Sequence, residues 1–118
     1  MEFQNEELDY NWLIMKQLDR IGHLSAQVLN DIQDDKWDEV KTFNLLFAVN
    51  TLRNMIPEEL HDTNYVKEMK KLDSENVLDS EGVPNPKHVY ERINARQVAI
   101  VNLLARTGYL LKKKATIN

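Results

Sequence analysis

Residues that interrupt regular secondary structure are rare in this chain. Only 3 Gly and 3 Pro occur among its 118 residues. With so few turn signals the chain must divide into a few long elements, and long elements are usually helices. Apolar residues recur mostly three or four positions apart, which is the spacing of an amphipathic helix. The sequence therefore predicts an all-α fold.

The first helix is predicted over residues 5–33. At about 1.5 Å per residue it would be roughly 40 Å long, which is long for a small domain. Its apolar face is expected to comprise Leu8, Trp12, Met15, Leu18, Ile21, Leu29 and Ile32, widened by Ile14 and Val28.

The second helix is predicted over residues 36–56, with Asp34 or Asp35 as its cap and Pro57 ending it. Its centre, "FNLLFAV" (43–49), is apolar almost all round. A helix of that kind is buried on most sides. We therefore expect the second helix to be the central element of the core.

A short third helix is predicted over residues 64–72, capped by Asp62 or Thr63. The acidic, turn-rich segment 73–86 follows, and we interpret it as a long mobile loop, because loops of this length are uncommon within compact domains.

The last helix is predicted over residues 86–106. Asn85 is a suitable cap, Pro86 suits the first helical position, and Gly108 suits a left-handed closing residue. The expected fold is a single four-helix bundle-like domain over residues 1–118, with three long helices and one short one. Residues 109–118 form a basic tail.

Small residues in the middle of the first helix would let another backbone approach closely. That backbone belongs either to the same chain or to a second copy, and the long first helix favours a homo-oligomer. The candidate oligomer-interface residues are Leu18, Gly22, Ser25 and Leu29.

Charge is distributed unevenly. Residues 84–118 carry 7 basic and 1 acidic side chains, whereas residues 1–83 carry 8 and 18, for a net charge of −4. The basic end either binds nucleic acid or faces the acidic remainder of the chain. The candidate nucleic-acid residues are Arg92, Arg96, Arg106, Lys112, Lys113 and Lys114.

Few residues suggest catalysis. The chain has no Cys, which excludes disulfides and thiolate chemistry, and it has no glycine-rich phosphate loop. Glu58-x-x-His61 is a single copy of a spacing that di-iron bundles use twice. The acidic pairs 35/38 and 59/62 have the spacing seen in all-α magnesium-dependent nucleotide pyrophosphohydrolases, but acids at helix starts also complement the helix dipole. We predict no catalytic residue, cofactor or metal.

These observations predict a non-enzymatic helical interaction or assembly protein that binds itself or a protein partner. A small DNA- or RNA-binding accessory factor is the first alternative, and the pyrophosphohydrolase is the second. Helical chains of this size are common in viruses and mobile elements, so an accessory role there is a further expectation. No apolar run is long enough to span a membrane, and the acidic N-terminus is unlike a signal peptide. We expect a cytoplasmic protein, in the host cytoplasm if it is viral.

Overall fold

The computed structural model describes the backbone of residues 2–78 and 84–108, and the side chains within these ranges from Asn11 onward. Its elements are α1 (Glu2–Gln33), α2 (Glu39–Met55), the 3-10 helix η1 (Glu58–Leu60), α3 (Thr63–Asp73) and α4 (Pro86–Thr107). The described ranges contain no strand. The fold is all-α and bundle-like, with three long helices and one short α-helix, which confirms the predicted fold class.

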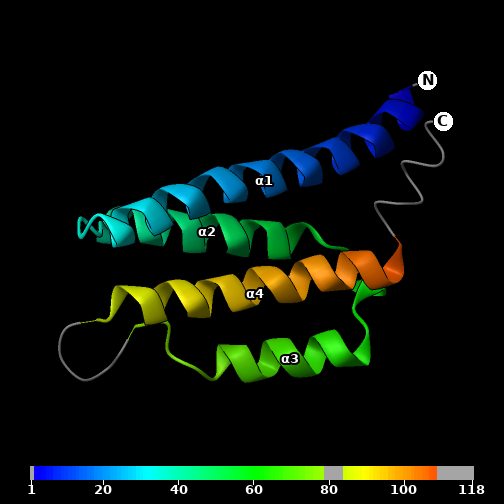
Figure 1. Cartoon of the computed structure of the whole chain (residues 1–118). Helices are drawn as coiled ribbons and strands as arrows, with labels where there is room; N and C mark the ends of the chain where they lie inside the picture. The colour runs from blue at the N-terminus through cyan, green and yellow to red at the C-terminus, as the bar shows by residue number, and fades with distance from the viewer. Residues whose placement is uncertain (1, 79–83, 109–118) are drawn as a thin grey trace.

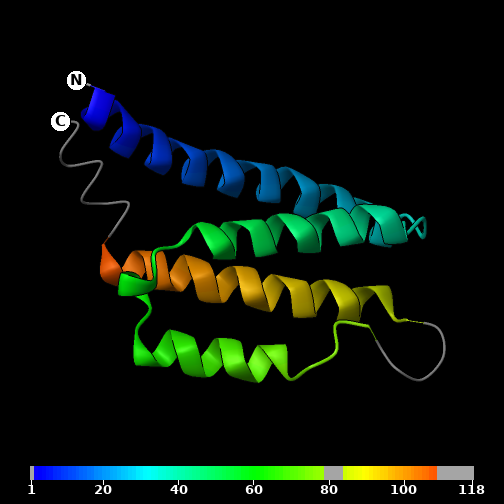
Figure 2. The same ribbon diagram turned by 180° about the vertical axis from the view of Figure 1, so that it is seen from behind.

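The helices lie side by side in a single bundle-like array. α2 and α4 run in the same direction, opposite to α1 and α3 (Figure 1). α1 packs mainly on α2, and α3 packs on α4 on the side away from α1 (Figures 1 and 2). Toward its N-terminal end α1 separates from α4, so these two helices touch along only part of their length.

The core lies where α1, α2 and α4 meet, and it continues between α3 and α4. Burial of these apolar side chains is the main term that stabilises the fold. Its fully buried members are Ile14, Ile21, Val28, Leu45, Val49, Leu52, Val89, Ile93, Ile100, Leu103 and Leu104.

α1 presents a different face to the core than the one predicted. Ile14, Ile21 and Val28, seven residues apart, are almost completely buried. Trp12 and Met15, which were expected in the core, are 57% and 53% exposed. Both sets have helical spacing, and the packing of α2 and α4 decides between them. The predicted core face was therefore wrong at Trp12 and Met15, and also at Leu29, which is 39% exposed.

The turn between α1 and α2 corrects the predicted start of the second helix. α2 begins at Glu39 rather than residue 36, and its cap is Asp38, whose carboxylate accepts a hydrogen bond from the Val40 N–H. Asp35 instead adopts a left-handed conformation with φ of 56°. The Asp35 N–H donates to the Ile32 carbonyl and the Lys36 N–H to the Asp31 carbonyl, which is the hydrogen-bond pattern of a Schellman helix end.

The other helix ends lie within one residue of the predicted ones, except that α1 begins at Glu2 rather than at residue 5. Asp62 caps α3 by accepting from the Tyr65 N–H, and Asn85 caps α4, with Pro86 at the first helical position. Gly108 closes α4 in a left-handed conformation with φ of 65°. Residues 79–83 and the tail 109–118 lie outside the described residues, so the mobility of segment 73–86 and the role of the tail stay predictions.

None of the helices in the described part of the chain is both long and apolar enough to cross a membrane.

Candidate interaction surface

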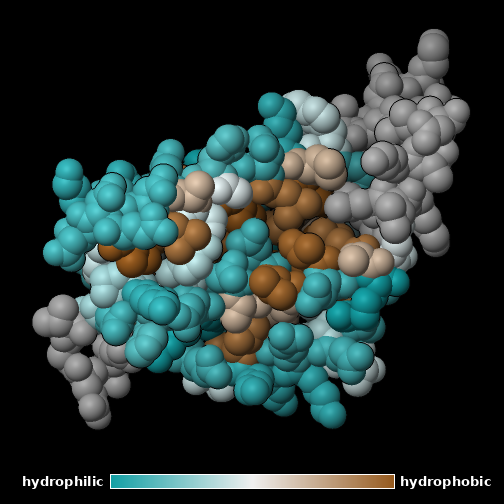
Figure 3. Space-filling model, in the orientation of Figure 1, coloured by the Kyte–Doolittle hydropathy of each residue, from teal (hydrophilic) through white to brown (hydrophobic). Residues whose placement is uncertain are grey.

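The first candidate surface follows the line along which α1 and α4 meet. Ser25 on α1 and Tyr90 on α4 are joined by a hydrogen bond of 2.7 Å between their hydroxyl oxygens. Met15 of α1 and Val101 of α4 each lie about 15 Å from this contact, measured along their own helix. Both are displaced toward the end at which the two helices separate. Figure 3 shows apolar side chains gathered between α1 and α4 on this side of the molecule.

We call the uncovered strip along this line the seam face. It consists of Met15, Gly22 and Leu29 of α1 with Val98 and Val101 of α4. Apart from the glycine, these side chains are between 39% and 53% exposed. They are apolar groups that the described part of the chain does not cover.

The four predicted interface residues all lie along this seam, but they differ in exposure. Leu18 and Ser25 are half-buried against the rest of the chain, whereas Gly22 and Leu29 are exposed. A Cβ atom added at Gly22 would meet no atom within 4 Å. The close helix crossing predicted at Gly22 is therefore absent within the chain, and only the alternative, an approach by another molecule, is left as a prediction.

The second candidate surface is on α2. Thr42, Leu45, Ala48, Val49 and Leu52 form the buried face of this helix. On the opposite side, Val40, Phe43 and Phe47 are 67%, 39% and 75% exposed. Their spacing of three and four residues places them in one row along the helix. We call this row the α2 outer face.

The α2 outer face corrects the prediction that the second helix is buried on most sides. Among the described elements, α1 and α4 cover one side of α2, and α3 touches it at its end through the Arg53–Asp73 pair. α2 lies behind α1 and α4 in Figure 1 and in front of them in Figure 2, so its outer face and the seam face are on opposite sides of the molecule.

The part of the α2 outer face around Phe43 and Phe47 is polar but uncharged, whereas Val40 stands between Glu39 and Lys41. Residues 42–52 contain no Asp, Glu, Lys or Arg. Asn44, Asn50 and Asn54 are exposed beside the apolar row. Depletion of charge around exposed aromatic side chains is the composition found at the centre of protein interfaces.

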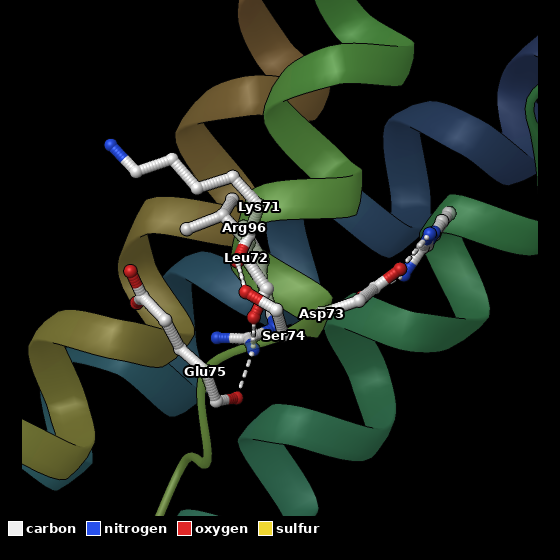
Figure 4. Close-up of polar contacts among 7 residues, drawn as sticks. Lys71, Leu72, Asp73, Ser74, Glu75 and Arg96 are labelled. Carbon is white, nitrogen blue, oxygen red and sulfur yellow. Dashed lines mark hydrogen bonds and ion pairs between the residues drawn. The ribbon is translucent and has the colours of Figure 1, made fainter.

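The basic residues of α4 have structural roles. Arg96 is 5% exposed and extends from α4 to the end of α3 (Figure 4). Its guanidinium donates to the carbonyl oxygens of Leu72, Glu75 and Arg92 at 2.5, 3.3 and 2.7 Å. Burial lowers the pKa of this guanidinium. It is thus a C-terminal cap of α3, buried away from any phosphate in solution.

Arg92 and Arg106 are also bonded within the chain. Arg92 donates to the Val77 carbonyl at 3.2 Å, which ties the segment after α3 to α4. Arg106 makes a two-pronged contact with Asp62, with both N–O distances at 2.9 Å, and its hydrogen bonds hold the pKa of the Asp62 carboxyl below its ordinary value. For this pair, the expectation that the basic end faces the acidic part of the chain is confirmed. Lys112, Lys113 and Lys114 lie outside the described residues.

The acidic and histidine motifs do not converge on a common centre. Asp38 and Asp62 cap α2 and α3, and the His61 ring lies against the Tyr65 ring with centroids 4.9 Å apart. In the described ranges no three His, Asp or Glu side chains are grouped as metal ligands. The sequence motifs 35/38, 59/62 and 58/61 are accounted for locally by caps and turns.

The fold and these surfaces define an all-α bundle with two uncovered apolar faces. Comparisons of the chain with protein-family models, with curated proteins and with solved structures gave no match.

Proposed function

We propose that this chain is a non-enzymatic helical protein that assembles with other protein chains, a second copy of itself included. One observation carries the proposal: apolar side chains at helical spacing are uncovered on two opposite sides of the bundle. The role in a virus or mobile element and the cytoplasmic location stay predictions from the sequence.

The arrangement of the exposed apolar side chains, rather than their number, supports the proposal. Single apolar residues scattered over a surface are normal in monomeric proteins. Here seven of the ten large apolar side chains that are exposed in the described residues follow one row on α2 and one seam between α1 and α4, and Trp12, Leu13 and Val66 are the exceptions. Phe and Met are also residue types that are enriched in interfaces. Covering Phe47, which is 75% exposed, would favour a complex by about 1–2 kcal/mol on its own.

The nucleic-acid alternative gains little support from the described residues. Arg96 is buried, and Arg106 is paired with a carboxylate, so a phosphate would have to displace bonds that hold the fold together. Clustered Lys and Arg with free donors are what phosphate contact requires. That alternative now depends on Lys112–Lys114 of the tail.

The enzyme alternative likewise finds its candidate acids engaged in the fold. Asp38 and Asp62 both accept backbone N–H bonds as helix caps, and Asp62 also holds Arg106. A pair of acids used to bind magnesium would have to leave these contacts.

Capture of partners by the tagged full chain from a lysate of its own source, with and without nuclease, tests the proposal. We expect protein partners that remain after nuclease treatment. Val101→Lys on the seam face should release those bound there, whereas Val66→Lys is the matched control, because Val66 is an exposed valine (52%) on α3 away from both faces. Retention of nucleic acid alone would contradict the proposal and favour nucleic-acid binding by the tail.

A further inference from the structure

We infer that the α2 outer face is the site at which a second copy of this chain binds. The two α2 helices pair antiparallel about a two-fold axis, with Phe43 of each copy against Phe47 of the other. This inference rests on the proposed assembly function and specifies which surface self-associates.

The apolar side chains of α2 need more cover than the described part of the chain supplies. A helix whose centre is apolar almost all round is expected to be buried on most sides. α1 and α4 cover the face with Leu45 and Val49, and α3 packs elsewhere, on α4. Phe47 on the opposite side is 75% exposed. None of the described helices covers this side, so we assign its cover to another molecule.

The absence of charge suits pairing with another copy. In an isologous pair each surface meets itself, so any charge near the axis faces a like charge. A surface without charged side chains avoids that repulsion. Residues 42–52 of α2 form such a surface. The amides of Asn44 and Asn50 both donate and accept, so they can pair with their own kind.

The distribution of acids fixes the direction of pairing. Asp34, Asp35, Asp38 and Glu39 cluster at the N-terminal end of α2. A parallel pair would bring two such clusters together, whereas an antiparallel pair separates them by about the length of the helix, roughly 25 Å. The antiparallel pair also opposes the two helix dipoles.

The spacing of the aromatic residues suits this arrangement. Phe43 and Phe47 are four residues apart and share one side of the helix. An antiparallel register centred between them makes two equivalent Phe–Phe contacts, and aromatic pairs add to the effect of burial alone.

The size of the surface sets the strength of the dimer. At about 200 Å² for a whole aromatic side chain, Phe43 and Phe47 expose roughly 230 Å² per copy. A standard stable interface buries about 800 Å² per partner. The area of the two phenylalanines is thus a little over a quarter of such an interface, and Val40, Asn44 and Asn50 surround them. The dimer should be reversible and dependent on concentration.

Sedimentation equilibrium of the purified full chain, from about 1 µM to about 1 mM, tests the inference. The intact protein should pass from monomer to dimer in this range. Phe47→Lys should weaken the dimer at least about tenfold, because it places a charge at the centre of a small interface. Val66→Lys, the control, should not change the equilibrium. Phe47 is 75% exposed, so its replacement leaves the core intact.

Disulfide cross-linking tests the register independently, because the chain has no Cys of its own. In the proposed pair, residue 44 lies next to the two-fold axis, close to its equivalent in the other copy. Residue 54 lies about 27 Å from its equivalent along the helix axes. Mild oxidation should therefore link Asn44→Cys into a covalent dimer and leave Asn54→Cys monomeric.

Three results would overturn the inference: a strict monomer at every concentration, a dimer unaffected by Phe47→Lys, or equal cross-linking at the two cysteines. None of these would remove the proposed assembly function, which the partner capture tests through Val101→Lys. Self-association lost in Val101→Lys and kept in Phe47→Lys would move the self-interface to the seam face.

Discussion

Replacing Arg96 with Met should destabilise the protein strongly, although the change removes a charge from its interior. Arg96 is 5% exposed and is surrounded by carbonyl oxygens. Met has a similar flexible length and fills the space of the aliphatic stem without strain. The substitution therefore isolates the hydrogen bonds of the guanidinium.

The magnitude follows from the hydrogen bonds that are lost, since the Leu72 carbonyl still accepts from the Glu75 N–H at 3.1 Å. The bond to the Leu72 carbonyl comes from a charged donor and ends on a buried residue, and such bonds contribute about 1.5–3 kcal/mol. Glu75 is exposed, so its carbonyl regains water at little cost. Removing the guanidinium also removes the cost of burying its charge, which offsets part of the lost stability. We expect the free energy of unfolding to fall by about 2–3 kcal/mol, and Arg96→Lys to recover only part of it because an ammonium lacks the planar fork.

Urea unfolding followed by circular dichroism measures this difference, and Arg20→Met is the control, because Arg20 is an exposed arginine on α1. Hydrogen exchange should accelerate first in the last turn of α3, whose carbonyls Arg96 holds. If Arg96→Met is as stable as Arg20→Met, Arg96 is not the cap that secures α3 to α4, and the structural role argued for it is wrong.

Three further predictions concern other elements. Asp35→Gly should raise the free energy of unfolding by up to about 1 kcal/mol, because the left-handed φ of 56° suits glycine, and an unchanged urea midpoint would contradict this. Gly22→Ala should add about 0.5–1 kcal/mol without changing the dimer measured by sedimentation, since the added methyl meets no atom within 4 Å; a weaker dimer would place Gly22 in an interface. Hydrogen bonds from Arg53 lower the pKa of Asp73, so this pair stabilises the fold above the ordinary carboxyl pKa of about 4, and the contribution is lost as pH falls through the lower folded-state pKa. Thermal unfolding of Asp73→Asn across this range should depend less on pH than that of the intact protein.

Helix ends were predictable because local residues determine them. Asn85 with Pro86, Asp62 and Gly108 each act through bonds to residues within one turn, so the sequence alone identifies them. The predicted start of α2 was wrong for a related reason. Asp34, Asp35 and Asp38 are all suitable caps, and the left-handed turn at Asp35 decides that only Asp38 can act as one.

The orientation of α1 was not predictable, because it depends on distant residues. Ile14, Ile21 and Val28 form one stripe, and Trp12 and Met15 belong to another. Either stripe satisfies helical periodicity. The choice is made by contacts with α2, such as the bond from the Gln17 side chain to the Ala48 carbonyl, thirty-one residues away in sequence. No local signal contains that information.

The α2 helix shows what the pattern of apolar residues in a sequence can indicate and what it cannot. An apolar composition on all sides indicates that a helix is covered, but it does not say by which chain. In this molecule α1 and α4 occupy one side of α2 and α3 is used against α4, so no described helix is left for the side bearing Phe47. Two arginines, by contrast, pair with carboxylates inside the chain, Arg106 with Asp62 and Arg53 with Asp73. The uncovered apolar side of α2, together with the engagement of these arginines in the fold, is the reason that we propose assembly with another protein chain rather than with nucleic acid.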